Sequence, residues 1–153
     1  MIVTAVYDCM VLLQALSKPD RTSGNCFRAV IDGRVRLAVS NATLLEVEDV
    51  VNRPDLRERV FKVTDAQVRS FLDLLVRVSV LVADVPMVCR LPGDRKDEKH
   101  LNLAIAAHAE FIVTRDNLLL GLMTAENPDA FAFRAAHPTI ETLLPETFLA
   151  RLA

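Results

Sequence analysis

The sequence predicts an α/β fold in which helices flank a central, mostly parallel sheet. Two observations carry this prediction. Short apolar runs recur at 2–7, 35–39, 78–83 and 111–113, and the segments between them show apolar residues at helical spacing. Strands that alternate with helices favour a parallel sheet with helices on both faces.

Length and composition agree with one ordinary domain spanning residues 1–153. A chain of 153 residues is long enough to bury about two-thirds of its unfolded surface. Its formal net charge of -2 and isoelectric point of about 5.9 provide no global basic field for a nucleic acid, so any such binding must be local. Three widely spaced cysteines, an odd number, fit a reducing cytosol. No apolar run is long enough to cross a membrane, so we expect a cytoplasmic protein without a membrane partner.

The first half of the chain is predicted element by element. The strand at 2–7 leads directly into a helical run. Turn-forming residues then precede a short helix at 26–31, which ends at an Asp-Gly pair. The strand at 35–39 follows, and Ser40 or Asn41 caps the next helix.

The second half continues the alternation. A break at 52–54 precedes a short helix at 55–60, and Thr64 caps a longer helix. We expect a strand at 78–83, a loop at 86–93, and a helix that begins at Asp97. The strand at 111–113 follows, while Phe131 and Phe133, within 121–138, either cover the core or form an interface.

Two of these strands end close to an aspartate. Asp8 follows the strand at 2–7, and Asp116 comes shortly after the strand at 111–113. Ligands of open parallel sheets bind at the carboxyl ends of the strands where the strand order reverses, so neighbouring strands bring these acids together. Asp97, at the start of its helix, leans inward and joins them. Three converging carboxylates repel one another unless a cation lies among them, which favours a divalent metal site.

Each acid also has a purely structural interpretation. Asp94 can cap the helix that follows it, and Asp97 can stabilise the same helix N-terminus through the macrodipole. Asp116 can belong to a turn, and Asp8 can cap the helix after its strand. Glu46 lies at the edge of the apolar stripe of its helix, and the hypothesis from its spacing is that it completes a four-acid cluster.

A set of motifs follows one another in a characteristic order. They are the strand ending in Asp8, Ser40 to Glu46 at a helix start, Asn52-Arg53-Pro54, Gly93 to Glu98 before Leu101 to Ala104, and Val113-Thr114-Arg115-Asp116. Together they resemble a PIN domain, in the branch that contains toxins of toxin-antitoxin pairs. The resemblance covers nearly the whole chain, including a final strand and helix at 139–149, and implies a PIN-like three-layer fold.

The resemblance implies a metal-dependent endoribonuclease, a hydrolase that cleaves single-stranded RNA and leaves a 5′-phosphate and a 3′-hydroxyl. Asp8, Glu46, Asp97 and Asp116 match the catalytic acids, and Asp94 matches an accessory acid. Mg²⁺ or Mn²⁺, which prefer carboxylate oxygen, would be held by Asp8, Asp97 and Asp116. An antitoxin protein and a homodimer are the partners that suit this branch.

Three positions depart from the family pattern. Met10 replaces a usual Asn, Leu118 replaces a frequent second acid, and Glu98 replaces an Asn after the helix-opening acid. Losses of this supporting polar shell typically cost about 10 to 100-fold in metal affinity or activity. The alternative function is therefore a catalytically impaired PIN-like module that binds RNA or protein. A phosphatase-like pocket is disfavoured because Asp8-Cys9-Met10 lacks a second acid.

Basic residues near the acidic motifs are candidates for RNA phosphate contacts, with ordinary solvated surface as the alternative. They are Arg53, Arg95, Lys96, Lys99 and Arg115. An aromatic content of 5% leaves few rings for base stacking.

Other polar candidates receive structural interpretations. We expect His100 to be half-buried by packing and His108 to be a hydrogen-bonded core or boundary residue. Cys9 has no histidine near it in the sequence to activate its thiolate, so we expect a packed small side chain.

Overall fold

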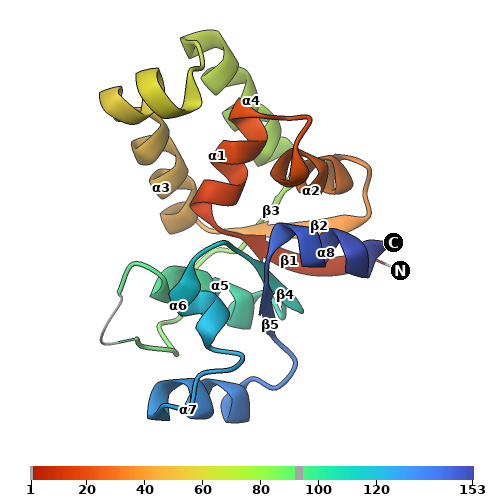
Figure 1. Ribbon diagram of the computed structural model, residues 1–153, viewed down its shortest axis with the longest axis vertical. Coiled ribbons are helices and arrows are strands. Elements are labelled where there is room, and N and C mark those ends of the chain that lie inside the picture. Colours follow the sequence, from red (N-terminus) through yellow and green to blue (C-terminus); the bar gives the residue numbers. More distant parts are fainter. Residues whose placement is uncertain (1, 92–94) are drawn as a thin grey trace.

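Five parallel strands form one sheet in the computed structural model, which describes residues 2–91 and 95–153. Their order across the sheet is β3-β2-β1-β4-β5 (Figure 1). The strands are β1 (Val3–Tyr7), β2 (Val35–Val39), β3 (Val80–Leu81), β4 (Phe111–Val113) and β5 (Glu141–Leu143). The predicted α/β class is confirmed, and every strand pair among the described residues is parallel.

The strand order reverses at β1. From this central strand the chain moves outward through β2 to β3, and then returns to place β4 on the other side of β1. Val6 pairs with Ile112 and Tyr7 pairs with Val113, so β1 and β4 end beside each other. The N–H of Asp8 extends this pairing by donating to the Val113 carbonyl at 3.0 Å. The carboxyl ends of β1 and β4 therefore form the crevice where such sheets bind ligands.

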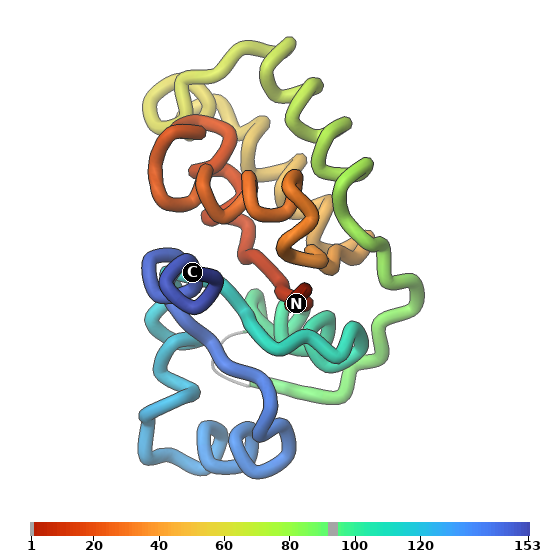
Figure 2. Tube along the Cα trace, turned by 90° about the vertical axis from the view of Figure 1, so that its right-hand side faces the viewer, coloured from red at the N-terminus to blue at the C-terminus, as the bar shows by residue number. Residues whose placement is uncertain are grey.

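The sheet is apolar on both faces because alternate strand residues enter two different cores. Ala5 and Tyr7 pack into one core, whereas Val6, between them, packs into the other with Ile112. Helices cover each face, and Figure 2 shows the two layers edge-on. The first layer contains α1 (Cys9–Ser17), α2 (Thr22–Ile31), α3 (Asn41–Val51), η1 (Leu56–Phe61), α4 (Asp65–Val78) and α8 (Pro145–Leu152). The second contains α5 (Glu98–Ala106), α6 (Asn117–Gly121) and α7 (Pro128–Ala136).

Predicted helix caps are present at their expected positions. Ser40 and Thr43 form a reciprocal capping box at the start of α3, and Thr64 does the same with Gln67 at the start of α4. These side chains satisfy backbone N–H groups that a helix start leaves without partners. Asp8 caps α1 in the same way.

Two predicted boundaries were wrong, and one predicted helix is of a different type. Helix α2 begins at Thr22 and not at residue 26, because Gly24 lets the helix lie directly against the preceding turn: a Cβ there would be 2.0 Å from the Pro19 carbonyl oxygen. Strand β3 is limited to Val80–Leu81 because α4 continues to Val78. The predicted helix at 55–60 is the π-helix η1, Leu56–Phe61.

The segment at 121–138 contains a helix that the sequence reading did not foresee. Asn127 caps α7 by accepting from the Ala130 N–H at 2.9 Å. Phe133 is buried in the second core, whereas Phe131 is 53% exposed and lies beneath the Arg134 guanidinium. Phe133 therefore covers the core. Among the described residues, no helix has the length and apolarity that crossing a membrane requires.

Candidate functional site

A pocket of about 370 Å³ opens at the carboxyl ends of β1 and β4. Its walls come from the start of α1, from α3, from the start of α5 and from the segment after β4. Four acids predicted from the sequence line it: Asp8, Glu46, Asp97 and Asp116. The structure thus brings these acids to one place, while the accessory candidate Asp94 lies outside the described residues.

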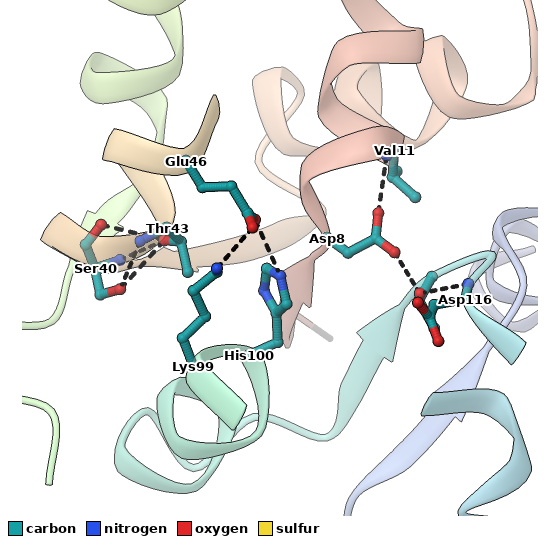
Figure 3. A network of polar contacts seen from close by, with 9 residues as sticks. Asp8, Val11, Ser40, Thr43, Glu46, Lys99, His100 and Asp116 are labelled. Atoms are coloured by element: carbon teal, nitrogen blue, oxygen red, sulfur yellow. Dashed lines mark hydrogen bonds and ion pairs between the residues drawn. The ribbon is translucent and has the colours of Figure 1, made fainter. Parts of the chain in front are cut away.

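Asp8 is buried and held by two hydrogen bonds. One carboxylate oxygen accepts from the Val11 N–H at 3.0 Å, which caps α1 (Figure 3). The other carboxylate oxygen accepts from the Thr114 hydroxyl. Each carboxylate oxygen has two acceptor sites, so each oxygen can accept a further contact. The structural interpretation of Asp8 as a helix cap is correct, and a capping Asp8 can also act as a metal ligand.

Asp116 lies across from Asp8 (Figure 3). It is the N-cap of α6, where its Oδ1 accepts from the Leu118 N–H at 2.8 Å and from the Leu119 N–H at 3.3 Å. Its own N–H donates to the Thr114 hydroxyl oxygen at 2.9 Å. The fully buried Thr114 hydroxyl therefore connects the two acids at the ends of β1 and β4.

Asp97 stands immediately before α5 and is 8% exposed, which confirms its expected inward position. Its side chain does not cap the helix. Its carbonyl oxygen instead accepts from the His100 and Leu101 N–H groups at 3.1 and 3.3 Å. Asp97 is one of the residues that line the pocket.

Glu46 is engaged by two side chains of α5 (Figure 3). Its Oε2 forms an ion pair with Lys99 Nζ at 2.6 Å, and its Oε1 lies 3.4 Å from His100 Nε2. Burial raises the pKa of Glu46, but the contacts with His100 and Lys99 outweigh burial and hold this pKa below its ordinary value. Glu46 is therefore an ionised group whose charge is balanced from within the protein.

His100 is more deeply buried than expected. It is 3% exposed, lines the pocket, and approaches Glu46 in addition to packing. Sequence reasoning missed this contact and the ion pair of Lys99, because both depend on how α3 packs against α5. The one feature of the sequence that indicated a position for His100 near the acids was its spacing from Asp97, because residues three apart fall on the same side of a helix.

The candidate RNA-binding residues do not all reach this pocket. Lys96 and Arg115 line it. Arg95 and Lys99 line a separate pocket of about 310 Å³. Arg53 is exposed and pairs with Asp49 at 2.8 Å, one turn away on α3.

Cys9 also lines the pocket, beside Asp8. Burial, and then the negative charges of Glu46 and Asp8, raise the pKa of its thiol to about 12. The thiol is therefore protonated at neutral pH, and the prediction of a packed small side chain is confirmed.

The donor set fits a hard divalent cation, because Asp8, Asp97 and Asp116 supply only carboxylate oxygen. The arrangement is open: within residues 2–91 and 95–153, no three His, Cys, Asp or Glu side chains are gathered closely enough to hold a metal ion. Closing such a site requires these acids to move toward one ion.

The fold and the site define an α/β protein with an acidic pocket at the switch point of a parallel sheet. The family model of the PIN domain matches residues 4–118, a stretch that contains all four acids. The chain belongs to the PIN-domain family, whose members are generally nucleases and typically bind divalent metals. No curated protein matches the chain.

Proposed function

We propose that this protein is a metal-dependent endoribonuclease that cleaves single-stranded RNA with Mg²⁺ or Mn²⁺. One observation carries the proposal. Asp8, Asp97 and Asp116 come from three separate parts of the chain and line one pocket at the switch point. Their side chains offer only carboxylate oxygen, the ligand type that Mg²⁺ and Mn²⁺ prefer.

In this proposal Asp8 and Asp97 hold the main ion, and Asp116 acts directly or through water. When bound, a divalent ion supplies positive charge to the phosphate and lowers the pKa of a water molecule. The protein keeps Asp8 in place through Val11 and Thr114, which limits the rearrangement that binding requires. Glu46 contacts Lys99 and His100, of which His100 lines the pocket, so in this arrangement Glu46 acts through those two side chains.

The reaction proposed is an in-line displacement at phosphorus. A water oxygen forms a bond to phosphorus as the bond to the ribose 3′-oxygen breaks, and the 3′-oxygen takes up a proton. The products are a 5′-phosphate and a 3′-hydroxyl, as the family resemblance implies. Lys96 and Arg115 line the pocket, and in this proposal their positive charges attract the substrate phosphate.

A second candidate function is an impaired PIN module that binds RNA or protein. The observation in its favour is that polar groups expected near the acids are absent or used elsewhere. Leu118 is 60% exposed and Met10 is 40% exposed. Glu98 is buried and accepts from the Leu91 N–H at 2.8 Å, so it anchors a loop.

The test is cleavage of a mixed single-stranded RNA pool with Mn²⁺, comparing wild type, Asp97→Asn and an EDTA control. Asp32→Asn, a change at an exposed acid at the end of α2, is the matched control purified in the same way. The nuclease proposal requires cutting by wild type and by Asp32→Asn, and none by Asp97→Asn or with EDTA. Equal cutting by all preparations, or cutting by none, contradicts the proposal and favours the binding module.

We further propose a cytoplasmic toxin, paired with an antitoxin protein and forming a homodimer. These proposals rest on the family branch that the motifs resemble. Expression of wild type in a bacterial host should arrest growth, and expression of Asp97→Asn should not. Growth at equal rates with both proteins contradicts the toxin role.

A further inference from the structure

A second pocket adjoins the acidic pocket and is continuous with it. Its volume is about 390 Å³, and Met10, Gln14 and Arg115 line both pockets. It runs between α1, the start of α2, and η1. We call it the α1–α2 groove. A ligand in the acidic pocket therefore has only these three shared residues between it and the groove.

The α1–α2 groove is lined mainly by positive charges, whereas the acidic pocket is lined mainly by negative ones. Lys18, Arg21 and Arg115 line it, against a single acid, Glu146. Arg115 is engaged with Glu146 through two hydrogen bonds of 3.2 and 2.6 Å. Lys18 and Arg21 are exposed, and among the described residues neither forms an ion pair. Two cations are thus available to a ligand.

The pocket on the opposite side of α5 offers no such path. Its two cations, Arg95 and Lys99, face two acids, Asp84 and Glu98. It shares no lining residue with the acidic pocket. Net positive charge and continuity with the acids occur together only in the α1–α2 groove, among these three pockets in the described part of the chain.

Gln14 stands at the junction of the two pockets. Its side-chain oxygen accepts from Ser23 Oγ at 2.9 Å and from Arg115 Nε at 3.3 Å, which orients the amide. Within the residues described, the amide nitrogen donates no hydrogen bond, so it remains available as a donor. Met10 and Val60 expose apolar surface in the same groove, 40% and 52% respectively. The groove therefore combines donors and cations with an apolar wall.

We propose that the α1–α2 groove binds the single-stranded substrate as it leaves the acidic pocket. Lys18 and Arg21 contact backbone phosphates beyond the one that is cut, and Met10 and Val60 contact a base or ribose. This inference rests on the proposed function. A nucleic-acid strand is favoured over an acidic peptide because the groove adjoins the pocket proposed to cut RNA, and a strand that extends beyond the cut carries a further phosphate at every nucleotide. Positive grooves that follow the backbone are typical of single-strand binding.

The test is length-dependent binding of labelled oligouridylate, two or eight nucleotides long, by fluorescence anisotropy. Measurements use Asp97→Asn with EDTA so that no strand is cut. Lys18→Gln/Arg21→Gln is compared with Arg28→Gln/Arg69→Gln, which removes two exposed charges outside the groove. All four side chains are exposed, so both variants should unfold at the parent temperature.

The proposal predicts that the eight-nucleotide strand binds more tightly than the dinucleotide, and that Lys18→Gln/Arg21→Gln removes this gain. The slope of log affinity against log salt should become shallower by about 1.4, because each phosphate contact on a single strand contributes about 0.7. The control variant should retain both properties. Equal length dependence in both double variants overturns the proposal. Displacement of the RNA by oligoglutamate as efficient as by unlabelled RNA overturns it in favour of an acidic peptide.

The outcome separates the two proposals. Length-dependent binding that needs Lys18 and Arg21, without Asp97-dependent cleavage of the RNA pool, supports the groove and contradicts the nuclease. If cleavage depends on Asp97 but RNA binding is unaffected by Lys18→Gln/Arg21→Gln, the groove proposal is overturned and the nuclease proposal stands.

Discussion

Asp8 accepts a hydrogen bond from the hydroxyl of Thr114, and this contact joins the ends of β1 and β4. The same hydroxyl oxygen accepts from the Asp116 N–H, so one buried side chain positions both acids. Its neighbours are the metal-binding candidates themselves, which makes Thr114 a positioning residue in the proposed site.

Thr114→Val should therefore weaken both the fold and the site. Leaving the Asp8 oxygen and the Asp116 N–H without this partner should lower the free energy of unfolding by about 1–3 kcal/mol. Loss of a group that orients metal ligands should lower Mn²⁺ affinity by about 10 to 100-fold. Urea denaturation and calorimetric titration with Mn²⁺ measure the two effects.

Thr142→Val is the matched control for this change. Thr142 is also buried, and its hydroxyl donates to the Leu119 carbonyl at 2.8 Å, away from the acids. Its loss should destabilise the fold by a comparable amount and leave Mn²⁺ affinity unchanged. Equal effects of both variants on Mn²⁺ affinity would show that Thr114 has no special link to the site.

Mn²⁺ should stabilise the folded protein. A ligand that binds only the native state at about 100 times its Kd adds about 2.7 kcal/mol to the free energy of unfolding. Asp97→Asn should lose most of this gain, and Asp32→Asn should keep it. Thermal unfolding with and without Mn²⁺ provides the measurement, and an Asp97→Asn protein stabilised as much as wild type would exclude Asp97 as a ligand.

The lowered pKa of Glu46 makes stability depend on pH. Although burial opposes ionisation, the contacts with His100 and Lys99 lower the pKa below the ordinary value of 4.5. The ionised form is thus favoured in the folded state. Its contribution is complete above the unfolded pKa and disappears as the pH falls through the lower folded pKa. The free-energy difference between wild type and Glu46→Gln should therefore shrink as the pH falls below about 4.5.

Lys99→Met provides the companion measurement. Removing this cation should raise the pKa of Glu46, so the loss of stability should begin at a higher pH than in wild type. Urea denaturation at a series of pH values compares the three proteins. A difference between wild type and Glu46→Gln that stays the same down to about pH 3 would contradict the assigned ion pair.

Gly24→Ala should destabilise the protein through a backbone collision. The added Cβ would lie 2.0 Å from the Pro19 carbonyl oxygen, so the turn before α2 must shift. Such overpacking typically costs about 1–3 kcal/mol. Gly121→Ala, where a Cβ meets no atom within 4 Å, should be neutral or stabilising by up to about 1 kcal/mol. Chemical denaturation of both variants tests the contrast, and equal stabilities would refute it.

The meeting of Asp8 and Asp116 could be predicted because it follows from general rules of parallel sheets. Apolar runs located β1 and β4, and acids at the ends of adjacent strands must share one edge. Helix caps such as Ser40 were predictable for a similar reason, since their signals lie within four residues. Local pattern and sheet geometry were sufficient for these features.

The environment of Glu46 could not be predicted in this way. Its partners Lys99 and His100 belong to a helix more than 50 residues later, and their approach depends on the packing of α3 against α5. The early start of α2 was also missed, because it depends on the close contact between Gly24 and Pro19. In both cases the structure depends on contacts between segments packed against each other, and the spacing of residues along the sequence does not determine those contacts.

The separation of β1 and β4 along the chain has a consequence for biosynthesis. Asp8 and Thr114 are 106 residues apart, so β1 leaves the ribosome long before the strand that completes its crevice. At about 5–20 residues per second, the interval is about 5–20 s. A nascent chain therefore holds one acid of the pocket without its partner until most of the protein has been synthesised. Any activity of the acidic pocket can therefore begin only after most of the protein's own messenger has been translated.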